Sequence, residues 1–137
     1  LLLHSDDLGA PFLETLDIDP ARVAYIDGTA IQTPWLMADQ VIDFRHALAA
    51  DIWPDADMLS TAKDVSAWAQ EHSLDQIVTP HAPVGPVQSL LKTLRKAGGA
   101  PITEMRREID TTAWPLATAG FFKFRKHIPN LLDQFAR

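Results

Sequence analysis

Residues 76–86, which read QIVTPHAPVGP, decide the fold of this chain. The apolar strand pattern at 76–79 runs directly into a loop that contains three prolines. The helix that follows carries its apolar side chains at helical spacing and ends at two glycines (Val87, Leu90, Leu91, Leu94, Gly98, Gly99). Basic residues in its last turn suit the negative end of the helix dipole, and glycine suits a left-handed cap. A strand, a loop and an amphipathic helix in this order predict a βαβ unit and therefore parallel strands.

Further strands and helices are predicted on both sides of this unit. Short apolar runs indicate strands at 1–3, 23–26 and 102–106, and Ile109 continues the last run. Apolar residues at helical spacing predict a helix within 34–54, and a second helix from the N-cap Ser60 to about His72. We therefore expect an α/β fold: a three-layer, mainly parallel open sheet of the Rossmann-like or flavodoxin-like type, with helices on both faces.

Length and composition indicate a single globular domain spanning 1–137. The chain has 137 residues, of which 47% are apolar and 22% are charged. It contains no cysteine, which excludes disulfides, thiolate metal sites and cysteine nucleophiles. The absence of cysteine also favours a cytoplasmic location. No apolar run approaches the roughly 20 residues that span a bilayer, so we expect no membrane role. Because the chain opens on an apolar strand pattern at Leu1 rather than on Met, we expect it to be a fragment of a longer protein.

The charge is divided along the chain. Residues 1–80 hold 14 acidic and 3 basic side chains, a net charge of −11, and residues 81–137 hold 4 acidic and 9 basic side chains, a net charge of +5. The basic part could meet phosphates or an acidic partner. The alternative is an ordinary solvated surface whose charges balance within the molecule.

The candidate binding residues come from the loops that follow the predicted strands. Ligands of open parallel sheets bind beyond the carboxyl ends of the strands, which here means loops 4–9, 27–33 and 79–86. We therefore predict that a small molecule would contact Asp6, Asp27, Thr79, His81 and Gly85. The loops lack the glycine fingerprints of dinucleotide and phosphate binding, and the alternative is a stiff loop without a ligand. No catalytic residue and no metal ligand set is assigned, and the bound molecule is unknown.

Two short segments are similar to enzyme motifs. Residues 3–9, LHSDDLG, resemble the Asp-Asp-Phe-Gly segment of metal-dependent carbohydrate deacetylases, which implies a hydrolase using Asp6 and Asp7 with His4. The other account of this segment is an Asp-Asp turn. Residues 25–29, YIDGT, are similar to the Asp-x-Asp-Gly-Thr signature of haloacid-dehalogenase-type phosphatases. Tyr25 stands where that family has its nucleophilic Asp, and a phenol cannot form the acyl phosphate.

Aromatic and basic residues alternate near the end of the chain. Trp114 precedes a segment, 121–126, that reads FFKFRK. The spacing of Phe121, Phe124, Ile128 and Leu131 or Leu132 is near helical, which predicts contacts in the core or at an interdomain face. Exposed aromatics would instead dock another domain, and aromatics among cations can also stack on nucleic-acid bases.

About half of the chain, residues 60–132, resembles the α/β domain of the DNA photolyase/cryptochrome family. The likeness rests on 77–87 (IVTPHAPVGPV), the helix at 90–97, the strand at 102–105, Trp114-Pro115, 120–125 (GFFKFR) and Ile128-Pro129. The resemblance implies an antenna-type α/β domain that leads toward a helical flavin-binding domain, with Trp114, Phe121 and Phe122 as the docking residues.

The resemblance also sets what the chain would do. The family's arginine-rich opening motif is not visible in residues 1–8, and no helical flavin-binding domain is present in the sequence. FAD or an antenna chromophore would be held only by a longer photolyase-like protein, and DNA would be contacted only indirectly. We thus expect a scaffold and an antenna or nucleotide-binding module without repair activity of its own. The alternatives are the metal-dependent hydrolase and a protein-interaction domain.

Overall fold

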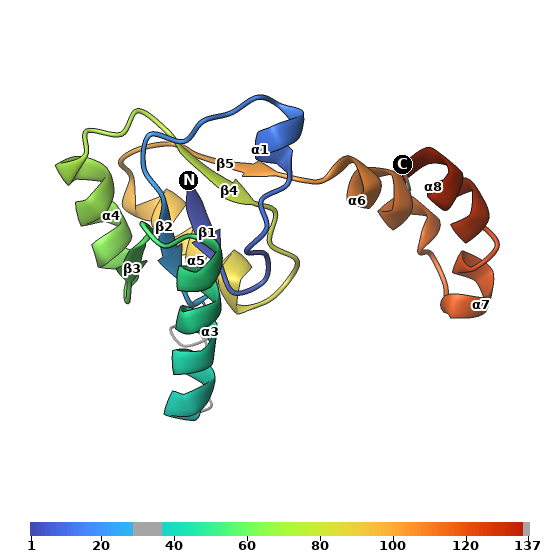
Figure 1. Cartoon of the computed structure of the whole chain (residues 1–137), viewed down its shortest axis with the longest axis horizontal. Coiled ribbons are helices and arrows are strands. Elements are labelled where there is room, and N and C mark those ends of the chain that lie inside the picture. The colour runs from blue at the N-terminus through green and yellow to red at the C-terminus, as the bar shows by residue number, and fades with distance from the viewer. Residues whose placement is uncertain (29–36, 136–137) are drawn as a thin grey trace. The chain divides into compact units, whose positions relative to one another are not determined.

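The computed structural model describes residues 1–28 and 37–135, and the chain divides into two compact units (Figure 1). Unit 1 comprises Leu1–Met105 and unit 2 comprises Arg106–Arg137. The prediction of a single domain over 1–137 stays a prediction. The fold is mixed α/β, as the pattern of short apolar runs and amphipathic segments predicts.

Unit 1 contains two small parallel sheets. Strands β1 (Leu2–His4), β2 (Ala24–Ile26) and β3 (Asp57–Leu59) form one sheet, in which Leu3 lies opposite Tyr25 and Tyr25 lies opposite Met58. Strands β4 (Ile77–Pro80) and β5 (Ile102–Met105) form the other, with Thr79 opposite Glu104. In addition, β1 contacts β4. The βαβ unit predicted from residues 76–86 is therefore confirmed.

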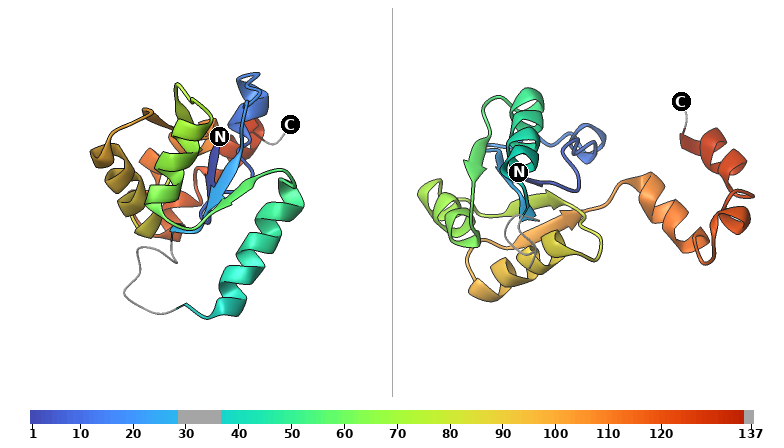
Figure 2. Two further views of the ribbon diagram at one scale, coloured as in Figure 1. Left: turned by 90° about the vertical axis from the view of Figure 1, so that its left-hand side faces the viewer. Right: turned by 90° about the horizontal axis from the view of Figure 1, so that it is seen from below.

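The helices of unit 1 pack in two groups. Buried residues of α4 (Ala62–Glu71) and α5 (Pro86–Ala97) share one apolar cluster with Leu2, Ala24, Ile26 and Ile77. Buried residues of α1 (Phe12–Thr15) and α3 (Asp39–Ile52) share a second cluster with Leu1, Leu3 and Tyr25. Because side chains alternate along a strand, the two clusters lie on opposite faces of the strands. Figure 2 shows α4 and α5 on one side of β1 and β2, and α3 on the other.

Helix α4 begins one residue later than predicted. Its N-cap is Thr61, not Ser60, because Thr61 Oγ1 accepts a hydrogen bond from the Asp64 N–H (3.2 Å) while the Asp64 carboxylate accepts one from the Thr61 N–H (2.8 Å). This capping box satisfies two amides at the start of the helix. The predicted end at His72 is confirmed. Helix α5 ends at Gly98, whose φ of 78° suits a residue without a Cβ.

Three local features differ from the prediction. Strand β3 and the short helix α1 were not predicted, because β3 begins with an aspartate and is largely exposed, so it shows no apolar run, and α1 is only four residues long. Ile109 does not continue a strand: β5 ends at Met105, and Ile109 lies in α6.

Unit 2 is helical. It contains α6 (Glu108–Ala113), the 3₁₀ turn η1 (Trp114–Leu116), α7 (Phe121–Phe124) and α8 (Ile128–Phe135). Of the residues predicted to lie in the core or at an interdomain face, Leu131 is buried, whereas Phe121 is 64% exposed and so is not a core residue of unit 2. Across the described ranges of both units, no helix has the length and apolar character needed to cross a membrane.

Candidate functional site

His4 joins the carboxyl ends of β1 and β4. Its ring is fully buried, and Nε2 lies 2.9 Å from the carbonyl oxygen of Pro80. Its Nδ1 accepts a hydrogen bond from the Asp6 N–H at 3.3 Å. Since Nδ1 is the acceptor, the proton lies on Nε2, which donates to Pro80. The histidine therefore fixes the start of the 79–86 loop against the end of β1.

Glu104 on β5 holds the same loop from the other side. Its carboxylate lies 2.9 Å from His81 Nδ1 and 2.8 Å from an Arg95 nitrogen of α5. It also accepts hydrogen bonds from the Ala82 N–H (3.3 Å) and from the Gln88 side chain (3.2 Å). Burial alone would raise the pKa of Glu104, but the hydrogen bonds from Arg95 and Ala82 and the nearby positive charge outweigh it, and the pKa is lowered. A charged carboxylate thus orients the His81 ring.

A second group of polar side chains lies on the α3 side of the strands. Asp27 is buried immediately after β2, and Arg45 of α3 lies 3.3 Å from both of its oxygens. Tyr25 is also buried, and its ring meets that of His46 edge to face at 5.6 Å. Burial raises the pKa of Tyr25, Asp27 and Asp6 raise it further, and Arg45 opposes them. Asp6 and Asp27 therefore act on one buried phenol.

The loop after β2 packs closely on the start of α5. A Cβ on Gly28 would lie 2.8 Å from Val87 Cγ2 and 3.0 Å from Val87 Cα, so only glycine fits without a shift. Gly85, the N-cap of α5, is in extended backbone, and a Cβ there would meet nothing within 4 Å. Close packing thus requires glycine at position 28 and not at position 85, and the predicted role of Gly85 in binding a ligand stays a prediction.

Three buried hydroxyls have no hydrogen-bond partner among the described residues: Ser5 Oγ, Tyr25 Oη and Thr79 Oγ1. Ser5 follows β1 directly and Thr79 lies in β4, which are the two strands that His4 connects. A buried hydroxyl without a partner is unfavourable, so each needs a water or a ligand group. These hydroxyls were not all expected: Thr79 was predicted as a binding residue, and Ser5 and Tyr25 were not.

The five predicted residues occupy the expected edge of unit 1 but fall into two groups. Asp6 and Asp27 belong with Tyr25 and Arg45, whereas Thr79, His81 and Gly85 belong to β4 and the start of α5. Three cavities lined by described residues lie elsewhere, between α4 and α5 (about 160 Å³), beside Arg22 (about 120 Å³) and along β3 (about 390 Å³).

The Asp6-Asp7 segment forms a turn. Asp7 Oδ1 accepts hydrogen bonds from the Gly9 N–H (3.0 Å) and the Ala10 N–H (3.4 Å), and both ring nitrogens of His4 are engaged. Within the ranges 1–28 and 37–135, no three His, Asp or Glu side chains gather as a metal site would require. This geometry does not support the alternative of a metal-dependent hydrolase. Hydrolase activity of the chain stays a prediction that nothing here tests.

Sequence reasoning missed the partners of the predicted residues. Arg45, Gln88, Arg95 and Glu104 are separated in sequence from the groups they contact by between 6 and 23 residues. One signal was available: Glu104 is an acidic residue inside an apolar strand, and a carboxylate in such a place needs a cationic partner.

No protein-family model matches the chain, and neither a curated protein nor a solved structure matches it.

Proposed function

We propose that the two sheets of unit 1 form one parallel layer in the order β3-β2-β1-β4-β5, between two layers of helices. Support comes from the contact between β1 and β4, the bond from His4 to Pro80, and the apolar clusters on opposite faces of the strands. This arrangement is the Rossmann-like, doubly wound form of the α/β fold. The connection that follows β1 runs to α1 on one face of the layer, whereas the connection that follows β4 runs to α5 on the opposite face. The direction of the connections therefore reverses between β1 and β4.

That reversal defines a crevice beyond the carboxyl ends of β1 and β4, where ligands of doubly wound sheets bind. The single observation that carries the proposal is the His4–Pro80 junction beside the buried, unpartnered Thr79 and Ser5 hydroxyls. The ligand is a small molecule with polar groups, held by Thr79, His81 and Gly85 on one side and by Asp6 and Asp27 on the other.

In function, the chain is the α/β domain of a photolyase-like protein. It serves as a cytoplasmic scaffold and as an antenna or nucleotide-binding module, and it does not repair DNA by itself. The βαβ unit of residues 76–105 supports this proposal, since these residues carry most of the resemblance to the photolyase family.

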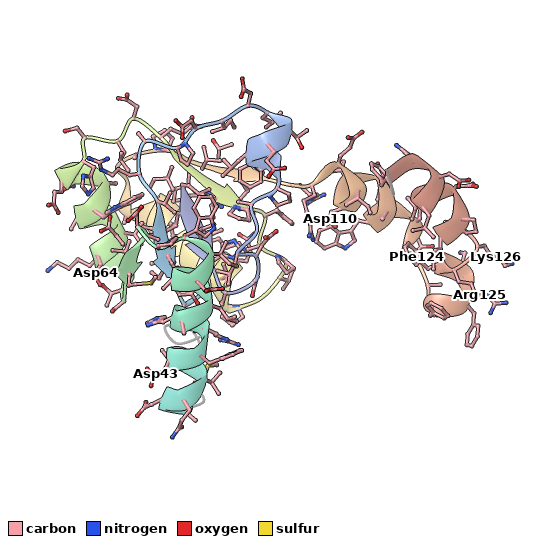
Figure 3. The ribbon with its side chains drawn as sticks, in the orientation of Figure 1. Asp43, Asp64, Asp110, Phe124, Arg125 and Lys126 are labelled. Carbon is pink, nitrogen blue, oxygen red and sulfur yellow. The ribbon has the colours of Figure 1, made fainter. Side chains whose placement is uncertain are left out.

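Unit 2 supplies the docking residues for a helical flavin-binding domain. Trp114 is 46%, Phe121 64% and Phe122 77% exposed, and guanidinium groups lie over two of these rings, Arg106 over Trp114 at 4.8 Å and Arg125 over Phe122 at 5.8 Å. Figure 3 shows Arg125 and Lys126 projecting from the end of α7. Large exposed aromatic rings beside cations are typical of surfaces that another domain covers.

This function is tested by whether a longer version of the chain binds FAD. If the gene continues into a flavin-binding domain, the longer protein will be yellow, and FAD will be released on denaturation. A colourless product with no released flavin contradicts the photolyase proposal. Replacing Phe122 by Ser in the longer protein should weaken flavin retention without unfolding unit 1.

Equilibrium dialysis against FMN and ATP tests the crevice in the chain as it stands. Thr79→Val removes the buried hydroxyl without changing the side-chain volume much, and we expect at least about tenfold weaker binding of whichever probe binds. Thr93→Val is the control, since Thr93 Oγ1 bonds only to its own helix, at Ser89 O (3.0 Å). Binding of neither probe, or equal affinity in both variants, contradicts the placement of the crevice.

A further inference from the structure

Residues 114–132 of unit 2 include three cations and no acidic side chain. The cations are Lys123, Arg125 and Lys126, and all three are exposed. Across residues 1–28 and 37–135, no carboxylate forms an ion pair with any of them. The positive charge of this part of unit 2 is therefore open to an external anion.

Two exposed phenylalanine rings lie among these cations. Phe121 is 64% and Phe122 77% exposed, and their rings meet edge to face at 5.8 Å. The Arg125 guanidinium lies 5.8 Å from the centre of the Phe122 ring. We call residues 121–126, which hold these rings and cations, the α7 segment.

Rings and cations alternate around the α7 segment. Helix α7 spans Phe121–Phe124, and its C-cap Arg125 keeps helical backbone angles. At 100° per residue, Arg125 projects between Phe121 and Phe122, and Lys123 projects between Phe122 and Phe124. A helix that lies on a membrane surface instead separates a charged face from an apolar face. The alternation therefore disfavours a lipid surface as the partner.

We propose that the α7 segment binds single-stranded nucleic acid without regard to sequence. An unpaired base stacks on the exposed ring of Phe122, and the backbone phosphates meet Lys123, Arg125 and Lys126. Charge complementarity supports a polyanion, since no carboxylate in residues 114–132 repels the phosphates. A duplex offers the same phosphates but keeps its bases stacked on one another, so the exposed rings favour a single strand.

This inference goes beyond the proposed function, and it differs from the indirect contact with DNA that the family resemblance implies. It concerns the chain as it stands. A flavin-binding domain docked on Phe121 and Phe122 would cover the same rings, so that domain and a nucleic acid would compete. The two proposals fail separately, because nucleic-acid binding is measured on this chain and flavin retention on a longer protein.

Fluorescence anisotropy with a labelled oligothymidylate of roughly twelve nucleotides tests the stacking. At about 50 mM salt we expect a dissociation constant on the order of 10 to 100 µM. Phe122→Leu keeps an apolar side chain but removes the ring, and it should bind at least about fivefold more weakly. Phe44→Leu is the matched control, because Phe44 is a 63% exposed phenylalanine of unit 1. It should bind like the wild type.

Three results of this experiment overturn the proposal, provided that circular dichroism shows each variant to be folded. They are no binding by the wild-type chain, equal affinity of Phe122→Leu and the wild type, and an equal loss of affinity in Phe44→Leu and Phe122→Leu.

The salt dependence of binding tests the phosphate contacts. Three cations on a single strand should make the logarithm of the association constant fall with the logarithm of the salt concentration at a slope of about −2. Lys126→Gln should weaken binding and make this slope shallower by about 0.7. Lys92→Gln, at an exposed lysine of α5, is the control and should change neither. A slope that Lys126→Gln leaves unchanged contradicts the phosphate contact.

Competition with other polyanions tests the choice of partner. The probes are the same oligothymidylate annealed to its complement, polyglutamate, and vesicles that contain phosphatidylserine. Each should bind at least about fivefold more weakly than the single strand, because none of them offers unpaired bases to Phe122. Equal or tighter binding of any one of these probes overturns the proposal and assigns the α7 segment to that class of partner.

Discussion

Glu104 illustrates how one carboxylate can set the conformation of a loop, here residues 79–86. It sits on β5, yet its partners come from the loop after β4 and from α5: His81, Ala82, Gln88 and Arg95. These contacts join β5 to the β4–α5 loop and to α5, which precede it in the chain. They therefore form only when β4, α5 and β5 have assembled. The His81 ring and the 79–86 loop are thus fixed by folding rather than by local sequence.

Replacing Glu104 by Gln should lower the free energy of unfolding at pH 7 by about 1 to 3 kcal/mol, because the partially buried Arg95 and His81 lose a charged acceptor. The pKa of Glu104 is lowered by folding, so its stabilisation is complete above the ordinary value of 4.5 and is lost as the pH falls below it. Urea unfolding at pH 7 and near pH 3 measures both effects.

The exposed Glu71 on α4 provides the control, and Glu71→Gln should change stability by less than about 0.5 kcal/mol. The difference between wild type and Glu104→Gln should shrink toward pH 3. A Glu104→Gln variant as stable as the wild type at pH 7 would contradict the role of this carboxylate.

At the scale of elements, the sequence pattern predicted the segments that carry an apolar run or amphipathic spacing and missed β3 and α1, which carry neither clearly. Strands β1, β2, β4 and β5 and helices α3, α4 and α5 match apolar runs or amphipathic spacing. Strand β3 begins with Asp57, whose carboxylate accepts a hydrogen bond from Trp68 Nε1 at 2.8 Å, so its place is set by a tertiary contact. The N-cap was misplaced by one residue because Ser60 and Thr61 are both good caps, and only the reciprocal bond with Asp64 separates them.

The capping box can be tested with neighbouring hydroxyl residues. Thr61→Ala should lower stability by about 1 kcal/mol, since the first turn of α4 loses its side-chain acceptor. Ser60→Ala, one residue earlier, should change stability by less than about 0.5 kcal/mol. Thermal or urea unfolding compares the two variants. A larger loss of stability for Ser60→Ala than for Thr61→Ala would show that Ser60, not Thr61, is the N-cap.

The contact between the β2 loop and α5 makes a second prediction for elements. Gly28→Ala should cost about 1 to 3 kcal/mol, because the added methyl group would overlap Val87, including its backbone. Gly85→Ala meets no atom within 4 Å, so it loses only the preference for glycine over alanine at an N-cap and should cost at most about 1 kcal/mol, less than Gly28→Ala. Equal stability of the two variants would show that the β2 loop and α5 are not packed as described.

At the scale of the whole molecule, the sequence nominated candidate binding residues by topology but could not predict their contacts. The rule that ligands bind beyond the carboxyl ends of parallel strands led to Asp27, Thr79 and His81, which lie in or directly after β2 and β4. It could not show that Arg45 approaches Asp27 or that His4 bonds to Pro80, since these pairs are 18 and 76 residues apart. Such pairings depend on strand order, which periodicity does not encode.

The charge division is also a property of the whole chain. Summed over the sequence of each unit, unit 1 carries 15 acidic and 6 basic side chains, a net −9, and unit 2 carries 3 acidic and 6 basic side chains, a net +3. The basic aromatic surface proposed for docking therefore belongs to unit 2, and the acidic excess belongs to unit 1, for which the crevice is proposed.

The central claim is that β1 and β4 are neighbours in one parallel layer and so form the crevice between their carboxyl ends. Nuclear Overhauser effects in the isotope-labelled chain test it most directly, because neighbouring strands lie about 4.8 Å apart. The account predicts contacts between protons of Leu3 or His4 and those of Val78 to Pro80, together with a slowly exchanging Nε2 proton on His4. Contacts of β1 with β2 alone, and of β4 with β5 alone, would contradict it.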